Sequence, residues 1–174
     1  MNIINKTNFN FVDEYILNYQ STIEKKYPEL INHTIEIDTG NGLRNTDPMA
    51  SDDLNRVDNK KHNHVLVNTD YGGIAGNINN RFNNEELYAL LSHEIGHLAA
   101  YYDTNVSDDK TEELFADKCA FELGLGSPMI EALKKMKDDR VQLGEAYFDF
   151  FNPVSLSIDD RLKELQAMEN QPKN

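Results

Sequence analysis

The residues best suited to chemistry in this sequence lie in the run His93-Glu94-Ile95-Gly96-His97. If the run is helical, residues four apart lie on one face, one turn apart. The two imidazoles can then bind one zinc ion at about 2.0–2.1 Å. Glu94 would lie beside the metal, where it can accept a proton from water. This HExxH spacing predicts a catalytic zinc site, and the alternative is two histidines that share a helix face without a metal.

A third protein ligand is expected from a second helix, because catalytic zinc usually takes three protein ligands and keeps one position open. We assign Glu113 to this role. Asp117, four residues later on the same face, would accept the outer N–H of a ligating histidine and fix its ring. Glu112 is the rival ligand, but we place it in the N-terminal cap of this helix. The alternative is that these acids lie on a solvated helix face.

Capping residues and apolar spacing place the helices that would position these groups. Asn83 and Glu86 match a capping box in front of a helix over 85–101. From Leu87 to Tyr102 this segment has one formal charge, Glu94, and two histidines, so it is apolar nearly all round, which indicates a buried helix with one apolar stripe. The stripe consists of Leu87, Leu91, Ile95, Leu98 and Tyr102. Asp109 and Glu112 match a second capping box, in front of a helix over 110–123 that would stop at Gly124.

The remaining elements are shorter or less strongly patterned. Further helices are expected over 9–25, from Ser127 and Pro128 onward, and over 158–168 behind Ser157. Short strands are expected over 34–37 and 64–68, and polar loops over 39–61 and 70–84. The chain is therefore expected to be an α+β protein, mainly helical with a small sheet. We expect a single domain over 1–174, with an upstream helix, sheet and loops over 1–83 and a helical catalytic part over 84–174.

The composition narrows the classes of function. The formal net charge of −13 disfavours binding to a phosphate backbone, so we expect no nucleic-acid partner. No stretch approaches the apolar length of a membrane span, and residues 1–10 do not resemble a signal peptide. Cys119 is the single cysteine in the sequence, which suits a reducing compartment. We therefore expect a cytoplasmic protein without a membrane partner.

Residues 84–97 (NEELYALLSHEIGH) resemble the active-site helix of gluzincin peptidases of the Ste24/HtpX type, the M48 family. Glu113, Ala116 and Asp117 match the E-x-x-x-D pattern of the later helix in that family. Residues 123–136 and the last helix, with Arg161, are similar to its following segments. Because this chain has no membrane helices, it is more similar to the soluble, minimal gluzincins.

The resemblance implies a zincin-like fold built on an active-site helix and a glutamate helix. It implies a zinc-dependent metalloendopeptidase that acts on a peptide or protein substrate. It also implies a sheet whose edge strand holds an extended peptide, and we place this strand at 64–68. The closing segment lacks a histidine often found in the family. Our candidate for the oxyanion-stabilising residue is instead Tyr147, with an aromatic core position as the alternative.

Other interpretations remain open at this stage. His62 and His64 could be extra metal ligands or polar residues of an edge strand, and a fourth ligand would make the zinc structural. Residues 65–68 and the Arg81-Phe82 pair resemble, more distantly, the ImmA/IrrE type of regulatory peptidase, which cleaves one partner. A non-enzymatic acidic protein that blocks a basic partner would need no metal. The sequence indicates neither the substrate nor the oligomeric state.

Overall fold

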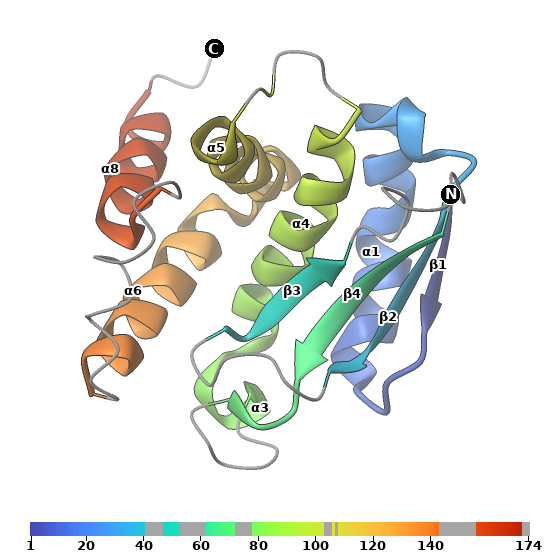
Figure 1. Ribbon diagram of the computed structural model, residues 1–174, viewed down its shortest axis with the longest axis horizontal. Coiled ribbons are helices and arrows are strands. Elements are labelled where there is room, and N and C mark those ends of the chain that lie inside the picture. Colours follow the sequence, from blue (N-terminus) through green and yellow to red (C-terminus); the bar gives the residue numbers. More distant parts are fainter. Residues whose placement is uncertain are drawn as a thin grey trace.

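The computed structural model describes residues 1–40, 47–52, 62–71, 78–102, 106, 108–142 and 156–171. The fold is mixed, with many helices and a small sheet (Figure 1). The strands are β1 (Asn2–Asn5), β2 (Thr34–Gly40), β3 (Met49–Asp52) and β4 (His62–Asn68). The helices are α1 (Asn10–Lys26), α3 (Ile78–Arg81), α4 (Asn84–Ala100), α5 (Asp109–Ala120), α6 (Gly126–Gln142) and α8 (Ile158–Glu169). A short 3₁₀ turn follows α1 at Pro28–Leu30. The expected α+β class is confirmed.

The described sheet has four strands in the order β1-β2-β4-β3. β1, β2 and β4 run parallel, and β3 pairs antiparallel with β4. Alternation along β2 buries Ile35 and Ile37, while β4 buries Val65 and Val67. These side chains build one apolar face. Figure 1 shows α1 and α4 lying behind the sheet, so this face is covered by helices.

The strand predictions were partly wrong. The strand placed at 64–68 exists as β4, but it lies between β2 and β3 and is not an edge strand. The edge beside α4 is β3, inside the segment 39–61 that we had predicted to be a loop. β1 was also missed, because its two isoleucines are flanked by asparagines and give no alternating pattern. α3 lies inside the predicted loop 70–84.

Helix α4 is the centre of the molecule. It contacts α1, α5, α6, β3 and β4, and Figure 1 shows it between α1 and the group formed by α5, α6 and α8. The predicted apolar stripe is buried as far as Leu98, whereas Tyr102 lies beyond the helix and is 37% exposed. In the part of the chain that the structure describes, no helix combines the length and apolarity that crossing a bilayer requires.

The start of α4 was predicted correctly, whereas the start of α5 was not. Asn83 accepts from the backbone N–H of Glu86, and the Glu86 carboxylate accepts from that of Asn83. At α5 the cap is Asp108 paired with Thr111, so the box expected from Asp109 and Glu112 does not form. Both candidate boxes fit the local spacing, and the one formed leaves Glu112 available for a contact with α4.

The junction of α5 and α6 is a short π-helical segment, Phe121–Leu125. Gly124 has a φ of 82° there, which only glycine adopts without strain, so the expected stop at Gly124 corresponds to a real change of direction. The next helix was expected to open with Ser127 as its cap, but it begins at Gly126, so Ser127 lies inside the helix. The Ser127 hydroxyl donates to Glu169 of α8.

The closest approach between α4 and α5 depends on Gly96. A Cβ atom at this position would lie 2.7 Å from the Ala116 Cα and 3.1 Å from the Cys119 Cβ. Real Cβ atoms do not come this close to backbone. The missing side chain therefore lets the backbones of the two helices approach beside the predicted ligand positions.

We predict that Gly96→Ala destabilises the protein, although alanine is the better helix former by about 1 kcal/mol. The added methyl group meets backbone, and overpacking of this kind costs about 1–3 kcal/mol. Because α5 must shift away from α4, zinc affinity should fall as well. Urea denaturation of the metal-free protein and a zinc titration measure the two effects. Equal or higher stability would show that the helices are not packed this closely.

Candidate metal centre

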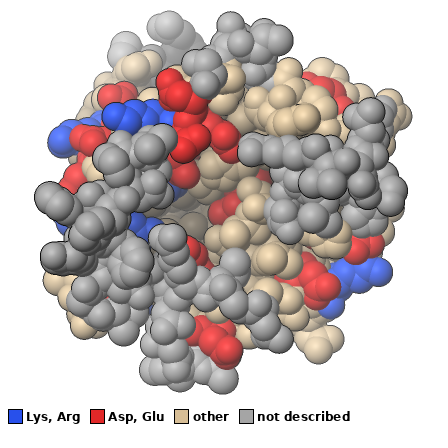
Figure 2. Space-filling model, in the orientation of Figure 1, with Lys and Arg blue, Asp and Glu red and all other residues tan. Residues whose placement is uncertain are grey.

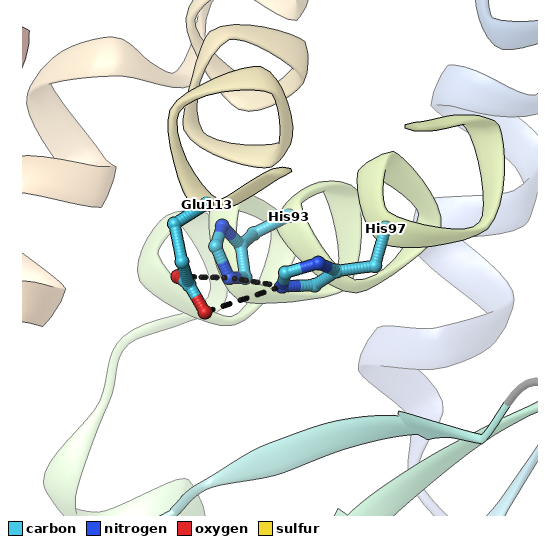
Figure 3. Close-up of side chains that lie close together, drawn as sticks. All are labelled: His93, His97 and Glu113. Carbon is cyan, nitrogen blue, oxygen red and sulfur yellow. Dashed lines mark hydrogen bonds and ion pairs between the residues drawn. The ribbon is translucent and has the colours of Figure 1, made fainter. Parts of the chain in front are cut away.

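The three predicted ligands converge on one point between α4 and α5 (Figure 3). The Nε2 atoms of His93 and His97 lie 3.0 Å apart. The Glu113 carboxylate places Oε2 3.6 Å from the His93 Nε2 and Oε1 3.8 Å from the His97 Nε2. One candidate ligand atom from each residue lies within 4.8 Å of the others. The three residues that the sequence predicted as metal ligands therefore lie together in the structure.

These separations suit a divalent cation. Ligand atoms bound tetrahedrally at about 2.0–2.1 Å lie about 3.3–3.4 Å from one another, close to the distances observed. Glu113 Oε2 is buried without a hydrogen-bond partner, so it can still accept a cation. Two nitrogen lone pairs 3.0 Å apart repel unless a proton or a cation lies between them. The residues therefore fit a metal ion, and the imidazole and carboxylate donors match those of zinc.

Carboxylates hold the outer nitrogen of each histidine. His93 Nδ1 lies 2.9 Å from Asp117 Oδ1, and His97 Nδ1 lies 2.9 Å from Glu112 Oε1. Because an ionised carboxylate only accepts, each Nδ1 carries the proton and each Nε2 turns its lone pair toward the shared centre. This arrangement fixes ring orientation and raises the basicity of the ligand nitrogen.

Sequence reasoning found one of these two carboxylates. Asp117 lies where it was predicted, against His93, and is completely buried. Glu112 was assigned to the helix cap, but it contacts His97 instead. The missed signal was the adjacent pair Glu112-Glu113, because neighbouring residues on a helix point about 100° apart. One of them can therefore face the metal while the other reaches the neighbouring ligand.

Arg161 on α8 completes the buried network. Its Nε and Nη2 donate to the two oxygens of Asp117 at 2.8 and 2.6 Å. Its Nη1 lies 2.9 Å from Glu113 Oε2, although outside hydrogen-bonding geometry. Arg161 is only 8% exposed. A fork-shaped guanidinium thus fixes two carboxylates one helical turn apart on α5.

The close packing of these charged groups shifts the pKa values of Asp117 and His97. Burial by itself raises the pKa of Asp117, but the charge of Arg161 and the hydrogen bond from His93 outweigh it and hold that pKa well below its usual range. Burial lowers the pKa of His97, but the hydrogen bond to Glu112 and the charges of Glu94 and Glu113 outweigh it and raise that pKa. The direction of the His97 shift is the one expected where carboxylates around a ligand favour positive charge.

A cavity of about 330 Å³ opens beside the three ligands. Glu94 lines it, next to His93 and His97, as a general base must. Residues of α6 and of the segment that leads into β3 form the opposite walls. Figure 2 shows this face of the molecule hollowed, with acidic side chains beside the hollow.

Tyr147, His62 and His64 were also candidates for the site. Tyr147 and the side chain of His62 lie outside the described residues. His64 is described, but within the described ranges the group that could hold a metal comprises only His93, His97 and Glu113. The described part of the chain therefore offers a site with three protein ligands.

We predict that Glu112→Ala weakens zinc binding by about 10- to 100-fold, because His97 loses the acceptor that orients its ring. The fold should remain intact, since Glu112 is partly exposed and caps nothing. Competition with a metal indicator, at one fixed pH for all variants, measures the effect. Glu122→Ala is the matched control, because this similarly exposed acid pairs with Lys26 instead. Equal affinities in the two variants would show that Glu112 does not support the ligand.

We predict that Arg161→Met destabilises the protein by about 3–5 kcal/mol, because it leaves the charge of Asp117 buried without its cation. Adding Asp117→Asn should recover part of this loss, since the uncompensated charge is then removed. Lys163→Met removes an exposed charge from the same helix and should change little. Urea denaturation compares the variants, and a small effect of Arg161→Met would mean that the network is not formed.

The chain was compared with protein-family models, with curated proteins and with solved structures, and none of them matches. The assignment of the centre uses three observations on the chain itself. Two histidines and one carboxylate converge from neighbouring helices, a carboxylate holds each outer nitrogen, and a cavity lies beside them. This arrangement identifies a candidate metal centre that could hold one divalent cation.

Proposed function

We propose that this protein is a zinc-dependent peptidase of the gluzincin type, with Glu94 as the general base. The observation that supports this most is the convergence of His93, His97 and Glu113 beside a cavity that Glu94 also lines. A metal site and a carboxylate that line one cavity are the two parts that metal-assisted hydrolysis needs. The resemblance of residues 84–97 to a peptidase active-site helix favours the same reaction.

The number of ligands favours a catalytic site over a structural one. Structural zinc sites are usually closed by four protein ligands, whereas catalytic sites keep one position open. Across the described ranges, the group that could bind a metal has three members, and it lies beside a cavity. An open coordination position that faces the cavity would be accessible to water and to a substrate carbonyl.

The chain's own residues would share the chemistry as follows. When bound here, zinc supplies Lewis acidity, which polarises a carbonyl oxygen and makes water a better nucleophile. The Glu94 carboxylate accepts the proton of the attacking water and passes it to the leaving amine. Asp117 and Glu112 keep the two imidazoles oriented, and Arg161 keeps Glu113 and Asp117 in place.

The substrate backbone would bind along β3, which corrects the strand that we had assigned to this role. β3 has β4 on one side within the described sheet, and its residues 49–51 line the cavity on the other. The free edge of a strand presents N–H and C=O groups that an extended peptide can pair with. This geometry would place a peptide bond between the sheet and the metal centre.

We predict that Glu94→Gln abolishes hydrolysis of a casein-type or synthetic peptide substrate while zinc content stays at one per chain. Glutamine keeps the size of the side chain but cannot accept the proton from water. Loss of a general base typically costs about 10²–10⁴-fold in rate. Peptide cleavage followed by mass spectrometry, together with metal analysis of the same samples, provides both readouts.

His93→Ala and Glu113→Ala are the complementary variants, because each removes a proposed ligand. Both should lose stoichiometric zinc and hydrolysis together. Glu112→Ala should lose affinity but recover activity at high zinc concentration. Full zinc affinity in Glu113→Ala, or normal hydrolysis in Glu94→Gln, would refute the proposed mechanism.

A further inference from the structure

We propose that the substrates of this site are basic protein segments, which carry lysine or arginine close to the cleaved bond. This inference rests on the proposed peptidase function and adds the substrate class to it. It follows from the balance of charge in and around the cavity, together with the chemistry of the side chains that line it.

Carboxylates outnumber cations in the lining of the cavity. Among the described residues, two arginines line it, Arg140 from α6 and Arg161 from α8. Four acidic residues line the same space: Asp47, Glu94, Glu112 and Glu113. Folding therefore gathers negative charge at one place, drawn from the segment before β3, from α4 and from α5.

Both arginines already lie against carboxylates of the chain. Arg140 Nη2 lies 3.3 Å from Asp47 Oδ1. Arg161 donates to Asp117, and its Nη1 lies 2.9 Å from Glu113 Oε2. Asp117 brings the carboxylates around the centre to five, which face two arginines, and a bound zinc ion would compensate two more negative charges. One negative charge then remains while both imidazoles are neutral, and a cationic group of a substrate can compensate it.

The negative charge continues along α5, outside the cavity. Asp109 is exposed in the first turn of this helix and lies one turn before Glu113 on the same face. Figure 2 shows acidic side chains beside the hollow. The whole chain has 30 acidic residues against 17 lysines and arginines, which gives a formal net charge of −13. A cleft in a body of low dielectric focuses such a field, so the cavity attracts basic segments and speeds their association.

The other lining residues suit the stem of a basic side chain. Leu90, Met129 and Met136 line the cavity together with the acids. Lysine and arginine combine an apolar stem with a cationic head, so the stem can contact these residues while the head lies near a carboxylate. An uncharged side chain would displace water from the carboxylates without providing a counterion, and an acidic one would be repelled. The lining therefore favours lysine or arginine over glutamate or aspartate.

The first test is cleavage of a diverse peptide library by the zinc-loaded full chain, with the cut sites read by mass spectrometry. Lysine or arginine should be enriched close to the cleaved bond. A peptide with lysine at the enriched position should have a kcat/KM about 10- to 100-fold above that of its glutamate counterpart, because the two differ in the sign of a charge near the carboxylates. Cut sites enriched in acidic or apolar residues, or in none, would overturn the substrate class while leaving the peptidase intact.

Variants of the ion pair between Asp47 and Arg140 separate the effect of charge from that of structure. Asp47→Asn removes a negative charge from the cavity and should lower the preference for lysine over glutamate by about 3- to 10-fold. Arg140→Gln removes a positive charge and should raise this preference by a similar factor. If the pair acted only by holding the segment before β3 against α6, both variants would break it and change the preference in the same direction. Changes of the same sign, or none, would refute selection by charge.

Salt and one exposed acid test the attraction at longer range. Raising the ionic strength from about 0.05 to 0.5 M should lower kcat/KM several-fold for a lysine peptide and leave that of an alanine peptide nearly unchanged. Asp109→Lys should lower kcat/KM for the lysine peptide by about two- to fivefold. Asp13→Lys is the matched control, because Asp13 is also exposed in the first turn of a helix, but in α1 behind the sheet (Figure 1). Equal effects of the two variants, or of salt on the two peptides, would show that the field at the cavity does not select the substrate.

A binding experiment separates failure of the substrate class from failure of the peptidase proposal. Zinc-loaded Glu94→Gln, which keeps the other carboxylates, is titrated calorimetrically with peptides that differ only in one residue, lysine, alanine or glutamate. The lysine peptide should bind about tenfold or more tighter than the glutamate peptide, and adding Asp47→Asn, but not Asp13→Asn, should reduce this difference. That result supports the inference even if the wild type cleaves nothing. Equal affinities for the three peptides, or equal effects of the two added substitutions, would refute it whatever the hydrolytic activity.

Discussion

The candidate site depends on one buried charge, the carboxylate of Asp117, which joins three helices. From α5 it accepts the outer N–H of His93 on α4 and the Nε and Nη2 N–H groups of Arg161 on α8. Burying a lone carboxylate would cost several kcal/mol, so the two partners are a condition of the fold as well as of the metal site. The guanidinium group of Arg161 and the imidazole ring of His93 are both rigid and planar. Their hydrogen bonds to Asp117 therefore set the orientation of His93 before any metal binds.

The candidate metal centre contains more carboxylates than the fold alone requires. Four carboxylates, those of Glu94, Glu112, Glu113 and Asp117, lie around the two imidazoles. Arg161 forms ion pairs with two of them, Glu113 and Asp117. Repulsion among these acids makes the metal-free state less stable than a neutral core would be. A divalent cation bound only by the folded chain would remove this repulsion and stabilise the fold by mass action. Local electrostatic cost of this kind is expected at functional sites.

The sequence predicted what is encoded locally and missed what depends on distant partners. The spacing of His93 and His97, the cap at Asn83 and the change of direction at Gly124 are properties of short segments, and the structure confirms them. The role of Glu112 was missed because its contact with His97 exists only once α5 packs on α4. The edge strand was misassigned because strand order is set by pairing between distant segments, and β3 is too short to show a period.

The helices around the site have separate roles, because some carry the proposed ligands and another lines the cavity. The proposed ligands come only from α4 and α5, whose spacing is set by Gly96 against Ala116. One side of the cavity is lined by α6, which is anchored to Glu86 near the start of α4 through Lys135. Met129 and Met136 line the cavity from α6, and neither is one of the proposed ligands. The metal centre and the shape of the cavity therefore depend on two different interfaces of the same central helix, α4 with α5 and α4 with α6.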